Sequence, residues 1–158
     1  MSEAVFSKIK SFLDSKELKY EIIVHEPVFT SEQAAKVRGT ELKSGAKAMV
    51  LRSKGKFFMF VLPADKKLDM KKIEKLLNTD RLSLATPDEV LKITDCKIGG
   101  VPPFGNLFSI PLYVDKSLLR NEIINFNAGL HTHSVRMNCK NYISAVSPMI
   151  EDFSAESS

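Results

Sequence analysis

Apolar residues recur at helical spacing at the start of the chain and follow strand-like patterns further on. The helical spacing predicts an amphipathic helix over residues 3–15, and the residues expected on its buried face are Val5, Phe6, Ile9, Phe12 and Leu13. Residues 20–25 are rich in β-forming types and end before Pro27, which predicts a short strand. Thr30-Ser31-Glu32-Gln33 has the spacing of a capping box, so we expect a short helix that begins there and ends at Gly39.

Two apolar runs, 46–52 and 57–62, flank the polar Ser53-Lys54-Gly55-Lys56 and predict a β-hairpin. The second run is apolar on both faces, so we expect it to be a central strand. Asp69 and Thr86 stand where helix N-caps are favoured, and each precedes a helical apolar pattern. In the first of these helices the expected buried residues are Met70, Ile73, Leu76 and Leu77.

The second half of the chain alternates short strands with short helices. Residues 107–114 predict a strand that Pro111 interrupts, as at a sheet edge or a bulge. The elements expected after it are a helix at 116–121, strands at 123–127 and 133–137, and a helix at 140–146 that Pro148 ends. There is no βαβα rhythm and no internal repeat. We therefore predict a single α+β domain over residues 1–151, with a curved, mostly antiparallel mixed sheet surrounded by helices, and a disordered polar tail at 152–158.

The composition is that of an ordinary globular protein, with 44% hydrophobic and 27% charged residues in 158. No apolar run approaches the roughly 20 residues of a membrane span, and the N-terminus lacks the pattern of a signal peptide. We expect a cytoplasmic protein without a membrane partner. Cys96 and Cys139 have no CxxC spacing, so isolated buried thiols are expected.

The net charge of +4 is unevenly distributed. Residues 36–76 contain twelve basic and four acidic side chains, a net charge of +8, so the remainder has −4. The basic residues are Lys36, Arg38, Lys43, Lys47, Arg52, Lys54, Lys56, Lys66, Lys67, Lys71, Lys72 and Lys75. Such a segment suits contact with a polyanion, because each neutralised phosphate releases counterions, and it equally suits a solvated lysine-rich face.

The sequence lacks the strong signatures of nucleotide, zinc and serine-hydrolase sites. His131 and His133 are two residues apart, which places them on one face of a strand, and only Cys139 lies nearby as a further ligand. A zinc site needs three or four ligands at supporting spacing. We therefore expect no metal and no cofactor.

Two features could bind a ligand without such motifs. Gly99-Gly100-Val101-Pro102-Pro103-Phe104-Gly105 combines three glycines with two prolines, and the backbone N–H groups of such a loop can recognise an anion. The alternative is a tight structural crossing. Lys47 stands alone among small and apolar residues, either solvated at the start of a strand or directed into a pocket.

These features resemble the YbaK/prolyl-tRNA-editing family, whose members deacylate mischarged tRNA. The resemblance spans about residues 19–146. It rests on four landmarks in order: Thr30 in His25-Glu26-Pro27-Val28-Phe29-Thr30, Lys47, the GxxxP loop Gly99–Pro103 continuing to Phe104 and Gly105, and Phe126-Asn127-Ala128-Gly129. It implies an enzyme that hydrolyses an aminoacyl ester at the acceptor end of tRNA, in particular tRNA for proline charged with a small amino acid. A synthetase partner is also implied.

The resemblance implies a role for each landmark. Lys47 would hold a phosphate or developing charge, and the loop amides would face the ester carbonyl. Because prolines cannot donate, these amides belong to Gly99, Gly100 or Val101. The residues expected to border the substrate are Phe29, Thr30, Pro103, Phe104, Gly105, Asn127, Ala128, Gly129 and His131.

The chain also departs from the family. Val101-Pro102-Pro103 lacks a hydroxyl residue that many relatives have before the last proline, and the turn Leu130-His131-Thr132-His133 differs from alanine- and cysteine-specific patterns. The amino acid removed therefore stays open. The alternatives are a non-catalytic tRNA-binding or synthetase-interaction module, and a small-molecule-binding protein if the lysines at 66–75 face away from the pocket.

Overall fold

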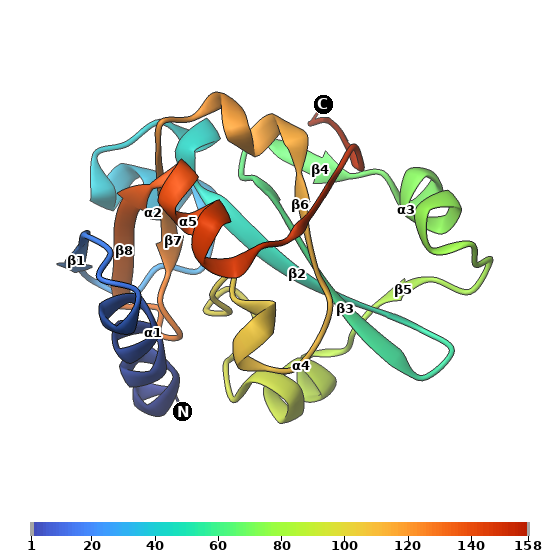
Figure 1. The fold of residues 1–158 in the computed structure, drawn as a ribbon, viewed down its shortest axis with the longest axis horizontal. Coiled ribbons are helices and arrows are strands. Elements are labelled where there is room, and N and C mark those ends of the chain that lie inside the picture. Colours follow the sequence, from blue (N-terminus) through green and yellow to red (C-terminus); the bar gives the residue numbers. More distant parts are fainter. Residues whose placement is uncertain (1, 158) are drawn as a thin grey trace.

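The computed structural model describes residues 2–157, with helices packed around three β-sheets (Figure 1). The helices are α1 (Glu3–Ser15), α2 (Ser31–Arg38), α3 (Met70–Leu77), α4 (Pro87–Thr94) and α5 (Cys139–Val146), with 3-10 turns η1 (Leu42–Ser44), η2 (Gly105–Leu107) and η3 (Lys116–Arg120). The strands are β1 (Tyr20–Val24), β2 (Ala46–Ser53), β3 (Lys56–Pro63), β4 (Lys66–Leu68), β5 (Ser83–Leu84), β6 (Leu112–Asp115), β7 (Ile123–Asn127), β8 (His133–Asn138), β9 (Met149–Glu151) and β10 (Ser154–Glu156).

The largest sheet has the strand order β5-β2-β3-β6-β9. The predicted hairpin forms β2 and β3, which pair antiparallel, and its turn places Lys54 and Gly55 at positive φ. This geometry matches the twist of the two arms. β3 lies between β2 and β6, so the prediction of a central strand from its apolar faces is confirmed. The pairs β3–β6 and β6–β9 are parallel.

A second, antiparallel sheet has the order β1-β8-β7 and meets the large sheet at a bridge between Gly45 and Asn125. α1 packs its buried residues Val5, Ile9 and Leu13 into the main core. The expected α+β class with a mixed, mostly antiparallel sheet is confirmed. The helix signals are confirmed as well, since Thr30, Asp69 and Thr86 cap α2, α3 and α4.

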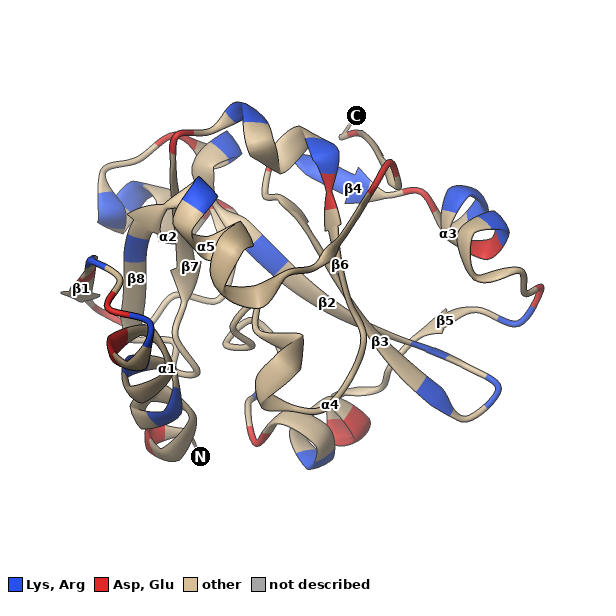
Figure 2. Ribbon diagram, in the orientation of Figure 1, with Lys and Arg blue, Asp and Glu red and all other residues tan. Residues whose placement is uncertain are grey.

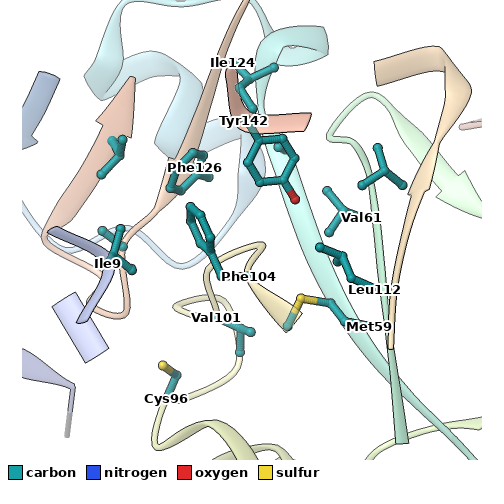
Figure 3. Packing of buried hydrophobic residues seen from close by; sticks show 14 of the residues in the cluster. Ile9, Met59, Val61, Cys96, Val101, Phe104, Leu112, Ile124, Phe126 and Tyr142 are labelled. Atoms are coloured by element: carbon teal, nitrogen blue, oxygen red, sulfur yellow. The ribbon is translucent and has the colours of Figure 1, made fainter. Parts of the chain in front are cut away.

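The main core centres on an aromatic group between the sheets, formed by Phe104, Phe126 and Tyr142 (Figure 3). The ring of Phe104 contacts Phe126 and Tyr142 edge-on, with centroid distances of 5.4 and 5.6 Å. The Tyr142 hydroxyl donates a 2.5 Å hydrogen bond to the carbonyl of Pro103. This core therefore fixes the loop that follows Val101.

Two of the predicted segments differ from the structure. The expected strand 107–114 begins only at Leu112, because Pro111 has no N–H to donate and the preceding residues form η2 and a turn with Ser109 at positive φ. Pro111 marks neither an edge nor a bulge but the residue before an interior strand.

The second difference is the tail expected to be disordered at 152–158. Its residues 154–156 form β10, which pairs with β4, and Phe153 is fully buried in a second core cluster with Phe60 and Ile73. Asp115 accepts hydrogen bonds from the Phe153 amide at 2.8 Å and from the Ser154 hydroxyl at 2.9 Å. The polar composition of the tail suggested disorder, whereas one aromatic residue and a distant strand partner order residues 153–156; residue 158 lies outside the described residues.

Candidate active site

A cavity of about 220 Å³ lies among α2, the start of β2, the loop before Val101 and the end of β7. This volume is below the roughly 300–1,000 Å³ of pockets that enclose drug-sized ligands, so the cavity suits a group the size of an amino acid. Small and apolar side chains form much of its wall, including Ala34, Ala48, Val50 and Val90. The polar residues of the wall are Thr30, Ser31, Arg38, Thr40, Glu41, Lys47 and Asn127.

Lys47 reaches this wall from the second residue of β2, where it pairs in register with Leu62 of β3. Its side chain is half-buried, and its ammonium makes no hydrogen bond or ion pair within residues 2–157. Burial lowers the pKa of Lys47, while the charges of Glu32 and Asp65 act in the opposite direction more weakly. A half-buried cation without a bonded partner is suited to an anionic ligand or to developing negative charge.

The glycine loop presents two free backbone amides at the cavity. The N–H of Gly100 donates to the carbonyl of Lys97 at 2.9 Å, so it cannot serve as an oxyanion donor. The amides of Gly99 and Val101 have no hydrogen-bond partner among the described residues, and both residues line the cavity. The three amides expected from the sequence are thus reduced to two.

The directions of these two amides are fixed from behind by the β7–β8 connection. The carbonyl of Gly100 accepts from the N–H of Gly129 at 2.9 Å, and the carbonyl of Ile98 is 3.0 Å from His131 Nε2, which must carry the proton because a carbonyl only accepts. In a trans peptide the carbonyl and the following N–H point in opposite directions. The Val101 and Gly99 amides are therefore directed away from this connection.

Arg38, at the C-terminal end of α2, adds a second cation to the wall. Its Nε donates to Ser134 Oγ and its Nη2 to Asn127 Oδ1, both at 2.9 Å, and the Asn127 amide donates in turn to the carbonyl of Gly99. No carboxylate pairs with Arg38 within the described chain. Burial, together with the charge of Arg136, lowers the pKa of Arg38 to about 10.

The structure brings together some of the residues expected at the site. Those that line the cavity are Phe29, Thr30, Lys47, Gly99, Val101 and Asn127. Gly100 lies within the loop with its N–H already bonded, Gly129 and His131 lie behind the loop and bond to its carbonyls, and Ala128 is buried in the main core. Arg38 was missed as a site residue, because a basic residue near the end of a polar helix gives no signal beyond its charge.

Pro103, Phe104 and Gly105 do not border the cavity, which corrects the expectation for them. Pro103 is buried and its carbonyl is bonded to Tyr142, while Phe104 is fully buried among aromatic rings. Gly105 is close-packed, since a Cβ there would lie 2.8 Å from the carbonyl oxygen of Ile110. The second half of the heptapeptide is the structural crossing considered as the alternative, and only the first half faces the cavity.

The two histidines are not on one strand face. His131 lies in the turn before β8, with its ring 4.9 Å from that of Phe29, whereas His133 begins β8 and packs against Phe6. Cys96 and Cys139 are buried free thiols, as expected. Within residues 2–157 no three side chains of His, Cys, Asp or Glu gather as a metal site would require. In the same part of the chain, no helix has the length and apolarity needed to cross a membrane.

The basic segment does not form one continuous face (Figure 2). α3 and the hairpin turn lie at the opposite end of the molecule from α2 (Figures 1 and 2). Several basic side chains are paired with acids, as in Lys66–Glu156 at 2.5 Å and Lys72–Asp152 at 3.1 Å. The cations that line the cavity are Arg38 and Lys47.

A small cavity with two free amides and two cations in its wall defines a site for an anionic or carbonyl-bearing ligand, and comparisons with known proteins specify the family. The model of the aminoacyl-tRNA editing domain matches residues 25–144. The multifunctional Ser/Thr-tRNA deacylase ProXp-y of Escherichia coli is 31% identical over 151 residues, covering 92% of this chain and 90% of that protein. The prolyl-tRNA editing protein ProX of Acetoanaerobium sticklandii is 30% identical over 74% of this chain and 73% of its own.

Solved structures agree with this result. A candidate trans-editing enzyme for prolyl-tRNA synthetase superposes with a TM-score of 0.84 at 25% identity, covering 98% of this chain and 99% of that one. A hypothetical protein of 23% identity has the same fold, with a TM-score of 0.86. The chain belongs to the aminoacyl-tRNA editing domain family. The resemblance inferred from the sequence, and the class of enzyme it implied, are thereby confirmed.

Proposed function

We propose that this protein acts in the cytoplasm as a trans-acting deacylase, which hydrolyses the ester of misacylated tRNA. The observation that supports this most directly is the pair of unpartnered amides, Gly99 and Val101, in the same cavity wall as Lys47. An ester carbonyl that is attacked develops negative charge on its oxygen. Fixed amides and a cation stabilise this charge without reorganising.

The reaction needs no nucleophile from the protein. A water molecule, placed by the cavity or by a polar group of the aminoacyl moiety, adds to the ester carbonyl carbon and releases one proton to the surrounding water, which returns a proton to the leaving oxygen when the ester bond breaks. The carbonyl oxygen becomes an oxyanion that the Gly99 and Val101 amides bind. When the oxyanion collapses, the carbon–oxygen bond to the ribose breaks, and the ribose oxygen takes up a proton. Positioning and charge stabilisation provide the acceleration, because an aminoacyl ester is intrinsically labile.

The substrate we propose is tRNA for proline that carries a small amino acid, with serine and threonine as the first candidates. The small cavity and its polar wall residues, such as Thr30 and Ser31, suit a short side chain that can form hydrogen bonds. The name of the E. coli relative, a Ser/Thr-tRNA deacylase, supports the same candidates. Phe29, Thr30 and Asn127 would border the aminoacyl group, and a prolyl-tRNA synthetase is the proposed partner, since such ligases contain similar sequence.

The test is a deacylation panel in which purified protein is incubated with seryl-, threonyl-, alanyl- and cysteinyl-tRNA for proline and the free amino acid is measured. We expect release from at least one substrate and a large loss in the Lys47→Ala variant. Folded protein that leaves the entire panel intact would refute the proposal. If such protein still binds tRNA in a salt-sensitive way, the chain is the non-catalytic tRNA-binding module instead.

A further inference from the structure

The guanidinium of Arg38 is a cation in the cavity wall for which the chain provides no anion. Of its five N–H groups, one bonds to Ser134 and one to Asn127, which leaves three donors. Nη1 lies beside Gly45, where a Cβ would be 3.9 Å away, and Gly45 also lines the cavity. The free edge of the guanidinium thus lies at the wall.

The surroundings of Arg38 are positively charged. Arg136 donates to the carbonyl of Arg38 at 3.2 Å, and after burial its charge is the second cause that lowers the pKa of Arg38. The acidic residue of the cavity wall is Glu41, which is exposed and lies 3.9 Å from Lys43. Keeping an arginine largely out of water beside another cation is costly unless a ligand supplies negative charge.

We infer that Arg38 binds the phosphate that precedes the terminal adenosine of the substrate. This inference rests on the proposed function, in which the aminoacyl ester occupies the same cavity, and it adds a phosphate-binding residue to that site. The phosphodiester is the anionic group nearest to the ester in such a substrate. A planar guanidinium with adjacent free donors suits two phosphate oxygens better than a lysine does.

Arg38 is held for this task by neutral partners. The Ser134 hydroxyl that accepts from Nε also lies 2.7 Å from His25 Nε2, and Asn127 is fixed between Arg38 and the loop carbonyl. Neutral partners orient the guanidinium without neutralising it, so its charge stays available to the ligand. The same Asn127 links the phosphate-binding residue to the loop that carries the Gly99 amide.

A first experiment measures binding of 5′-AMP and of adenosine to the protein, which does not require deacylation. We expect 5′-AMP to bind about tenfold to a hundredfold more tightly, as one or two charge-assisted hydrogen bonds would give. The variant R38Q should lose this preference. The variant K36Q removes the same charge from an exposed position of α2 outside the cavity and should keep it. Equal binding of the two ligands by wild type would overturn the inference.

A second experiment separates a ligand contact from a structural role. The substrates are an aminoacylated RNA hairpin, which contains the phosphate, and the matching aminoacyl-adenosine, which lacks it. R38Q should slow hydrolysis of the aminoacylated hairpin about tenfold to a hundredfold and leave hydrolysis of the aminoacyl-adenosine nearly unchanged. Equal slowing of both substrates would show that Arg38 only supports the loop. The variant R38K retains the charge but lacks the planar guanidinium, so its rate on the hairpin should lie between those of wild type and R38Q. If wild type hydrolyses neither substrate, the proposed function fails, while the nucleotide-binding result still decides the role of Arg38.

Discussion

Replacing Lys47 by methionine should separate activity from stability. The ammonium of Lys47 is half-buried without a bonded partner, and burial lowers its pKa. A lowered lysine pKa means that the folded state disfavours the charged form. The protonated side chain therefore costs stability at neutral pH, and this cost shrinks as the pH rises above the folded pKa and is gone above the ordinary value of 10.5. Methionine fills similar space without the charge.

The expected magnitudes follow from this environment. Losing one preorganised cation at a developing oxyanion costs about 3–4 kcal/mol of transition-state stabilisation, so kcat/KM should fall about 10²- to 10³-fold. The free energy of unfolding should stay unchanged or rise by up to about 1 kcal/mol, because a solvent-screened charge at this depth has a modest cost. The pair Lys43 and Glu41, joined at 3.9 Å on the exposed side, offers a control position nearby.

The assay combines single-turnover deacylation with urea unfolding, for wild type and for the variants K47M, K47R and K43M. We expect K43M to match wild type in both measurements and K47R to retain part of the activity. Activity of wild type should also fall at a lower pH than the ordinary lysine value of 10.5 as Lys47 deprotonates. If K47M loses activity only in proportion to its loss of folded protein, Lys47 is a structural residue and the reasoning is wrong.

Three further predictions concern the supports of the site and of the fold. Asn127→Ala removes the donor to the Gly99 carbonyl, so kcat should fall about tenfold with KM less affected, measured by steady-state deacylation. Gly129→Ala places a Cβ 3.1 Å from Val5 at a φ of +90°, and should cost about 1–3 kcal/mol in urea unfolding. For Asp115, burial would raise the pKa, but hydrogen bonds outweigh it and lower the pKa below the usual 3.8. The charged form thus stabilises the protein above this value and ceases to do so as pH falls through the folded pKa. Asp115→Asn should lower the free energy of unfolding by about 2–3 kcal/mol at pH 7. In thermal unfolding at acidic pH, the difference in stability between this variant and wild type should be smaller.

The sequence predicted the elements whose signals are local. Capping boxes at Thr30 and Thr86 and the turn at Gly55 depend on neighbouring residues, and each was correct. The order of β10 could not be predicted, because it depends on Asp115 and on a strand almost ninety residues earlier, β4. Predictions failed where the stabilising partner is distant in the chain.

The candidate site shows the same difference between features with local sequence signals and features that depend on distant contacts. Lys47 and the loop could be proposed from residue type, yet the occupied N–H of Gly100 and the core position of Phe104 depend on tertiary contacts. The role of Arg38 could not be predicted for the same reason, because the residues that orient it, Asn127 and Ser134, lie about ninety residues away in the chain. The sequence predicted several of the residues that form the site, but it could not show which of their groups lack hydrogen-bond partners and can therefore bind a ligand.

The two free amides have a consequence for how this protein would tolerate mutation. A donor made of main chain cannot be deleted by exchanging the side chain, and only proline at Val101 would remove that N–H. Because the Val101 side chain packs in the main core, exchanges to other small apolar residues should keep the N–H and the activity, whereas exchanges at Asn127 and His131, which orient the loop carbonyls, should often inactivate. In a saturation-mutagenesis map, conservative exchanges would therefore be silent at the residue that provides the reacting N–H and harmful at the residues that support it.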